Sequence, residues 1–61
     1  MIRMSQSQKT LERRTVIRDL LASMGLYPEE VLVLVNGILS TEDQAVEPDD
    51  DVEIIRIISS G

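Results

Sequence analysis

The stretch from residue 31 to residue 40 constrains the fold of this chain more than any other. Val31 to Val35 is an unbroken apolar run with a β-branched residue at every second position, which predicts a strand buried inside a sheet. Asn36-Gly37 follows directly, and this dipeptide favours a type I′ turn because both central positions of that turn need a positive φ. Ile38 to Ser40 then returns as a short strand, so the sequence predicts a β-hairpin here.

One amphipathic helix is predicted over residues 16–24. Its apolar positions recur at helical spacing and form a single face, made of Val16, Ile17, Leu20, Leu21 and Met24. Thr15 precedes this face and is expected to cap the helix through its hydroxyl. Gly25 follows it and can adopt the left-handed conformation that ends a helix. We expect Leu20 and Leu21 to be buried together with Val33 and Ile54.

The remaining segments predict three further strands. Residues 2–5 alternate in polarity, residues 5–8 can turn, and residues 9–13 can return with Leu11 as their apolar anchor. An acidic turn at residues 48–51, with Asp50 expected in a left-handed conformation, leads into a last strand at residues 52–58. The order is β-β-α-β-β-β. Its simplest two-layer arrangement is an α+β fold, with one helix on one face of a mixed sheet of four to five strands. Residues 1–58 form the domain, and residues 59–61 are a small polar tail that we expect to be flexible.

The composition disfavours an enzyme with its own catalytic site. The 61 residues allow one domain, and they include neither cysteine nor histidine. These absences remove thiolate nucleophiles, thiolate metal sites and the usual general base. The acidic run at residues 47–51 lacks the spaced ligands of a calcium loop and is interpreted as a solvated turn. We therefore expect no bound metal and no bound cofactor.

The charge balance narrows the choice of partners. Eleven acidic residues outnumber six basic ones, the net charge is −5, and Tyr27 is the only aromatic residue. Nucleic acid binding needs clustered basic residues and stacking aromatics, and anionic membranes need basic patches, so both are disfavoured. No apolar run approaches the roughly 18 residues of a membrane span. Residues 1–8 lack the apolar core of a signal peptide, so the cytoplasm is the expected location.

The last predicted strand is apolar on both of its faces. Val52 and Ile54 share one face, while Ile55 and Ile57 share the other. If the helix covers the first face, the second stays open, and an exposed apolar patch of this kind is typical of a partner site. The docking candidates are Ile55, Ile57, Leu32, Leu34 and Arg56, the last as a pairing group for acidic residues of a partner. The alternatives are that sheet neighbours cover these apolar residues or that they form a homodimer interface. For Arg56 the alternative is an ordinary surface charge.

The second half of the chain resembles ThiS/MoaD-type sulfur carriers. The resemblance lies in residues 31–39 (VLVLVNGIL), the pair Glu42-Asp43 and residues 49–61 (DDDVEIIRIISSG). The sequence is also similar to small archaeal modifier proteins and to the ubiquitin-related modifier, and residues 15–21 resemble the start of the family's helix. This resemblance implies a β-grasp (ubiquitin-like) fold.

The resemblance also implies a function. In such carriers a ThiF/MoeB-like activating enzyme uses ATP to adenylate the carboxylate of the terminal glycine, here Gly61, and sulfur transfer makes it a thiocarboxylate. The sulfur then goes to a synthase, either thiazole synthase in thiamin formation or the large subunit of molybdopterin synthase, or to transfer RNA thiolation. Some relatives are instead joined to lysines of other proteins. The carrier itself is not an enzyme.

The tail, Ser59, Ser60 and Gly61, departs from the family at one position. The family ends in Gly-Gly, and Ser60 stands in place of the penultimate glycine. A Cβ at that position is unfavourable in a tunnel shaped for glycine. The sequence therefore leaves a second hypothesis, a non-catalytic ubiquitin-like interaction module with an inactive Ser-Gly tail.

Overall fold

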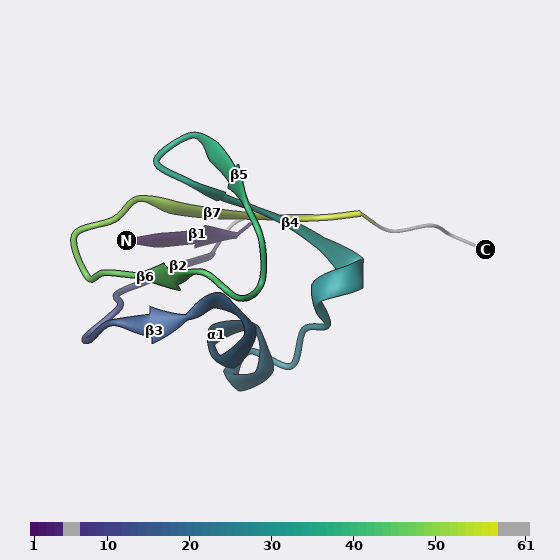
Figure 1. The fold of residues 1–61 in the computed structure, drawn as a ribbon, viewed down its shortest axis with the longest axis horizontal. Coiled ribbons are helices and arrows are strands. Elements are labelled where there is room, and N and C mark those ends of the chain that lie inside the picture. The colour runs from purple at the N-terminus through teal and green to yellow at the C-terminus, as the bar shows by residue number, and fades with distance from the viewer. Residues whose placement is uncertain (5–6, 58–61) are drawn as a thin grey trace.

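The computed structural model describes residues 1–4 and 7–57 (Figure 1). The described segments contain one α-helix, one short 3₁₀ turn and seven strands. In chain order these are β1 (Ile2–Met4), β2 (Ser7–Lys9), β3 (Thr15–Val16), α1 (Ile17–Ser23), η1 (Pro28–Glu30), β4 (Val31–Val35), β5 (Ile38–Ser40), β6 (Ala45–Val46) and β7 (Val52–Arg56). The predicted boundary after residue 58 and the tail at residues 59–61 lie outside the described residues.

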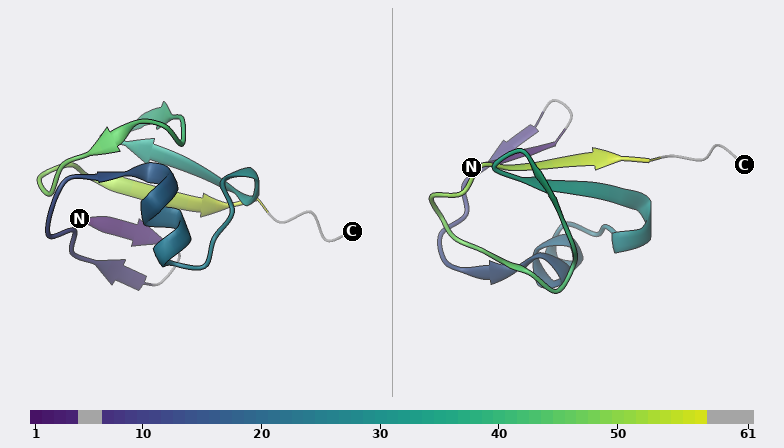
Figure 2. Two further views of the ribbon diagram at one scale, coloured as in Figure 1. Left: turned by 60° about the horizontal axis from the view of Figure 1, so that its bottom comes forward. Right: turned by 45° about the horizontal axis from the view of Figure 1, so that its top comes forward.

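Five of the strands form a mixed sheet in the order β2-β1-β7-β4-β5. β1 and β7 are parallel, and the other neighbours are antiparallel. The helix α1 lies across one face of this sheet, as the left view of Figure 2 shows. The α+β architecture, with one helix on a mixed sheet, is therefore confirmed. The sequence did not predict that β3 and β6 pair separately as a second, two-stranded sheet.

The core lies between α1 and the sheet. Leu20 and Leu21 are buried there together with Val33 and Ile54, as predicted. The full set of buried apolar residues is Ile2, Leu11, Ile17, Leu20, Leu21, Leu26, Val31, Val33, Val46, Val52 and Ile54. No polar or charged residue is buried in the described part of the chain, so the stability of the domain rests on apolar burial.

The two ends of α1 are closed by different means. At the C-terminal end Gly25 has φ +74°, its N–H bonds the carbonyl of Ala22, and the N–H of Leu26 bonds the carbonyl of Leu21 at 2.9 Å. This is the predicted glycine cap in its Schellman form. The predicted Thr15 cap is wrong, because Thr15 belongs to β3 and its hydroxyl bonds the carbonyl of Arg13.

The start of α1 is instead capped from a distant loop. The N–H groups of Ile17 and Arg18 donate to the carbonyls of Gln44 and Glu42, each at 2.8 Å. Backbone carbonyls thus satisfy the first free donors of the helix, a role that a side chain usually fills.

Two predicted strands have different bounds in the structure. The second strand covers Ser7–Lys9 and not residues 9–13. It is an edge strand that pairs only with β1, and backbone bonds suffice there without an apolar pattern. Leu11 is nevertheless buried, as an anchor beyond the strand. The last strand ends at Arg56, after which Ile57 donates to the carbonyl of Glu30 at 2.8 Å; residue 58 lies outside the described residues.

One of the two predicted left-handed turns is confirmed. Asn36 has φ +53° and Gly37 has φ +84°, as a type I′ turn requires. Asp50 does not have the expected positive φ, since Asn36 is the single non-glycine residue with one among those described. Asp50 instead stabilises its turn through its side chain, whose Oδ2 accepts the N–H of Glu47 at 2.8 Å.

Candidate docking surface

The sheet has an open face, on the side away from α1, where apolar side chains reach solvent. β7 and β4 each alternate between the two faces, so buried Ile54 is followed by exposed Ile55, and buried Val33 is preceded by exposed Leu32. Ile55 is 41% exposed, Leu32 40% and Ile57 51%. Together with half-buried Leu34 and exposed Leu39, these residues form what we call the docking patch: Leu32, Leu34, Leu39, Ile55 and Ile57.

Strand register brings the members of the docking patch together. Leu32 lies directly opposite Ile55 across β4 and β7, and Leu34 lies opposite Leu39 across β4 and β5. Directly opposite side chains on one face of a sheet are in contact range, so these pairs partly cover each other. The patch therefore spans three adjacent strands and is held in place by their backbone pairing.

Charged residues border the patch on the β1 side. Arg3 pairs with Asp51 through two bonds, Nη2 to Oδ2 at 2.9 Å and Nε to Oδ1 at 3.2 Å. The same guanidinium lies 4.0 Å from Oε1 of Glu53, which in turn stands opposite Leu34. These groups are about half exposed, so the pair contributes little stability. The apolar surface ends at these charged groups.

The acidic turn is tied to the tip of the β4–β5 hairpin by Asn36. The side chain of Asn36 donates to Oδ1 of Asp50 at 3.1 Å and accepts the N–H of Asp51 at 2.9 Å. Bonds from the Glu47 N–H and then from Asn36 hold the pKa of Asp50 below its usual range. The carboxylate is thus used within the fold. Residues 1–4 and 7–57 contain no group of three acidic, histidine or cysteine residues arranged to hold a metal ion.

The predicted docking residues do not all lie together. Ile55, Ile57 and Leu32 are exposed on the open face as predicted, and Leu34 lies half-buried beside them. Arg56 is exposed, but it stands opposite Val31 in the strand register. Its position therefore belongs to the other face of the sheet from the docking patch. Gly61, Ser59 and Ser60 lie outside the described residues.

Two exposed residues of β5, Ile38 and Leu39, were not predicted from the sequence as parts of this surface. Their exposed fractions are 69% and 63%. A signal for Leu39 was present, because an Asn36-Gly37 turn fixes the register that puts Leu39 opposite Leu34. No signal could reveal Ile38, since its exposure depends on how far the helix layer extends.

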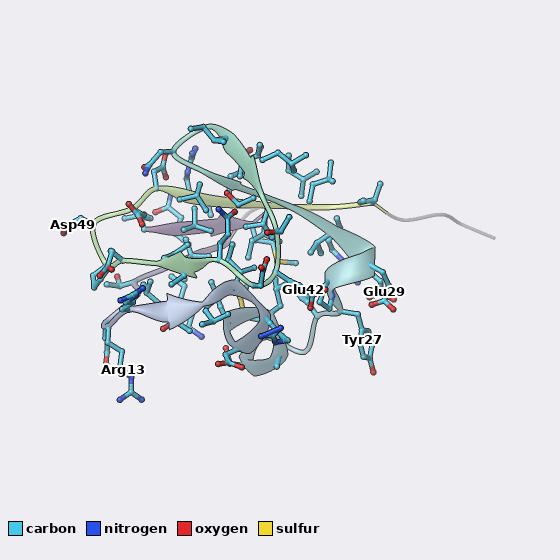
Figure 3. All side chains as sticks on the ribbon, in the orientation of Figure 1. Arg13, Tyr27, Glu29, Glu42 and Asp49 are labelled. Atoms are coloured by element: carbon cyan, nitrogen blue, oxygen red, sulfur yellow. The ribbon has the colours of Figure 1, made fainter. Side chains whose placement is uncertain are left out.

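Among residues 1–4 and 7–57, the large apolar side chains exposed outside the docking patch are Met1, Tyr27 and Ile38. Figure 3 shows Arg13, Tyr27 and Asp49 pointing outward from three separate parts of the molecule. No helix in the described ranges is long and apolar enough to cross a membrane.

A five-stranded mixed sheet with one helix across one face is the architecture of a ubiquitin-like β-grasp domain. The chain matches the family described as small archaeal modifier protein 2 over residues 4–58. It therefore belongs to that family, in agreement with the predicted relation to ThiS/MoaD-type carriers.

Membership defines the general role of the chain. Proteins of this family are small ubiquitin-like modifiers or sulfur carriers, generally without catalytic activity of their own. In general they interact with activating enzymes of the E1-like class. An exposed apolar patch is typical of a partner site, so the docking patch is the candidate surface for such an interaction.

Proposed function

We propose that this chain carries an activated carboxylate on Gly61. The carboxylate attacks the α-phosphorus of ATP on a ThiF/MoeB-like activating enzyme, pyrophosphate leaves, and an acyl-adenylate forms. A sulfide equivalent then attacks the acyl carbon and AMP departs, which leaves a thiocarboxylate. The chain supplies no acid, base or metal to these steps and is not itself an enzyme. ATP would bind the activating enzyme, and the proposed location of the reaction is the cytoplasm.

The observation that best supports this proposal is the position of the docking patch on β7. Ile55 is exposed on β7 and Ile57 is exposed just after this strand, on the segment that leads toward Gly61, and Leu32 stands beside Ile55. A partner that covers the patch would therefore hold the chain only a few residues from Gly61. Glycine suits the reacting position because it has no Cβ and admits close approach by the partner's backbone.

The destination of the sulfur is a further part of the proposal. The thiocarboxylate would serve thiazole synthase in thiamin formation, the large subunit of molybdopterin synthase, or transfer RNA thiolation, and the same activated end could be joined to lysines of other proteins. Ser60 favours one competing function, a ubiquitin-like interaction module that binds through the patch and is never activated.

The test uses the full chain, a cognate activating enzyme, ATP and a sulfur source. We expect pyrophosphate release, and an intact mass in which one sulfur replaces one oxygen. Deletion of Gly61 should abolish both signals. Ser60→Gly should speed activation by up to roughly tenfold, equivalent to about 1.4 kcal/mol in the barrier, because a Cβ leaves the segment that must enter the enzyme.

Ser59→Gly is the matched control, because it removes the same atoms one position further from the reacting end. It should change the rate less than Ser60→Gly does. If neither the native chain nor Ser60→Gly gives pyrophosphate release or a sulfur-containing mass, the carrier function is wrong and the interaction module is the better description.

A further inference from the structure

The edge strand β5 leaves two adjacent large apolar side chains in solvent. Ile38 and Leu39 are 69% and 63% exposed, more than any member of the docking patch on β4 or β7. Successive strand residues point to opposite faces. Leu39 stands opposite Leu34 on the open face, and Ile38 stands opposite Val35 on the face that α1 covers elsewhere. Both faces of this edge are therefore apolar and uncovered.

The backbone of β5 has one position free to accept another strand. Val35 and Ile38 flank the two-residue turn and form the hydrogen-bonded pair that closes it. The next pair, Leu34 and Leu39, is then non-hydrogen-bonded, and the N–H and C=O of Leu39 face away from β4. β5 is the last strand in the sheet order. Beyond it, the N–H of Thr41 is already bonded by Oε1 of Gln44 at 2.9 Å.

The β5 edge is only three residues long, but it lacks the charged residues and prolines that commonly prevent strand pairing. Residues 36–41 read Asn-Gly-Ile-Leu-Ser-Thr and include no charged residue and no proline. Natural sheets commonly protect edges with lysine, proline or covering elements. The opposite edge, β2, carries Lys9 and has the polar sequence Ser-Gln-Lys. The two edges thus differ, and β5 is the one suited to pairing.

We propose that β5 pairs antiparallel with β5 of a second copy of this chain, with Leu39 opposite Leu39 of that copy. The outward N–H and C=O of each Leu39 would then bond reciprocally across a two-fold axis. In this register Ile38 lies across from Ser40 of the second copy, and Asn36 lies across from Glu42. No acidic group meets another acidic group along the paired strands, although each chain has a net charge of −5.

Pairing of this kind has a consequence for the docking patch. Residues directly opposite each other in an antiparallel pair point to the same face. The open faces of both copies therefore lie on the same side of one continuous sheet, and the Leu34–Leu39 pairs of both copies become neighbours. Self-association thus extends the apolar surface without covering Ile55 or Leu32, and it does not depend on the proposed carrier function.

The association should be weak and strengthened by salt. A three-residue edge buries little area, so we expect a dissociation constant of roughly 0.1–1 mM. Repulsion between two acidic chains opposes pairing, and added salt screens that repulsion. Sedimentation equilibrium on the full chain, from about 10 µM to about 1 mM, should show a monomer–dimer equilibrium that shifts toward dimer as salt increases.

Three lysine substitutions separate edge pairing from stacking of two open faces. Ile38→Lys and Leu39→Lys should each weaken self-association at least about tenfold, because a lysine on an edge opposes strand pairing. Leu32→Lys places the same side chain on an interior strand of the open face and should leave the dimer unchanged. Circular dichroism establishes that each variant is folded. Amide hydrogen exchange of Leu39 in the unaltered protein gives a readout that needs no substitution, since its protection should rise with protein concentration.

Several outcomes would overturn the proposal. Loss of the dimer with Leu32→Lys but not with Ile38→Lys would assign self-association to the open faces. A monomer at every concentration and salt level, with a Leu39 amide that exchanges independently of concentration, would exclude a second copy as the occupant. If Ile38→Lys then weakened binding to the activating enzyme, the β5 edge would be a binding site for that enzyme and not for a second copy of the chain.

Discussion

The two faces of β7 carry similar side chains but differ in what covers them. Val52 and Ile54 are almost fully buried beneath α1, whereas Ile55 at an alternate position and Ile57 just after the strand are exposed. Aliphatic residues on the covered face contribute to folding through burial. The same residue type on the open face contributes little to the fold and is available to a partner. The alternation of side chains along one strand therefore separates residues that stabilise the fold from residues that remain exposed to solvent.

The largest effect is expected on the covered face. Leu20→Ala should lower the free energy of unfolding by about 2–5 kcal/mol, because it removes buried methyl groups where α1 packs on the sheet. This is a large share of the stability of so small a domain. Thermal or urea denaturation measures it. Arg18→Ala, on the exposed side of the same helix, is the control and should change stability by about 0.5 kcal/mol or less. An unchanged midpoint for Leu20→Ala would break the distinction between the faces.

A smaller effect on stability, but a large one on binding, is expected on the open face. Ile55→Asp should weaken binding to the activating enzyme at least about tenfold, since it places a charge in the apolar patch. It should cost no more than about 1 kcal/mol of folding stability, because Ile55 is already 41% exposed.

Binding titrations and a thermal melt test both parts of this expectation. Ala22→Asp adds the same charge on the exposed side of α1 and should leave binding nearly unchanged. Unfolding of the Ile55→Asp variant at neutral pH would show that Ile55 belongs to the core, and it would contradict the assignment of the docking patch.

The smallest effect concerns the acidic turn that precedes β7. The folded-state pKa of Asp50 is lowered by the Glu47 N–H and then by Asn36, so the ionised form stabilises the fold. That contribution is fully present above the unfolded pKa near 3.8 and is lost as the pH falls through the lower folded pKa. Asp50→Asn should melt below the native chain at pH 7, and the difference should shrink below about pH 4.

Melts of both chains across this pH range measure the contribution. The pKa of Asp43 is also lowered, chiefly by the hydrogen bond from the Thr41 side chain. Asp43 is unchanged in the Asp50→Asn variant, so some acid sensitivity should persist. A difference between the chains that grows on acidification would contradict the assigned sign.

The sequence predicted the elements whose pattern is local and missed those fixed by distant contacts. The alternation of residues 31–35 and 52–56 and the turn at Asn36-Gly37 were sufficient to predict the hairpin and the open face. A second strand paired with the first was predicted, but the bounds of β2 could not be, because its pairing needs no apolar pattern. The cap of α1 could not be predicted because its acceptors, the carbonyls of Glu42 and Gln44, carry no side-chain signal.

The candidate site shows the same division. Ile55 and Leu32 follow from strand alternation alone, and the structure agrees with that prediction. The exposure of Ile38 depends on how far a seven-residue helix extends over the sheet, which no local pattern encodes. The residues around Gly61 were singled out by resemblance to a family, and the sequence around them has no pattern that physical reasoning alone could interpret.

The position of β7 also determines when this domain can fold. β7 is the last described strand along the chain, yet it lies between β1 and β4 in the sheet and joins them. During synthesis β1 and the β4–β5 hairpin therefore have no central strand until residue 56 has left the ribosome. Contacts between such distant segments slow folding, because loop closure must precede them. We expect a nascent chain that stops before Val52 to have no stable tertiary structure, and the assembled sheet to form in one cooperative step after synthesis passes β7.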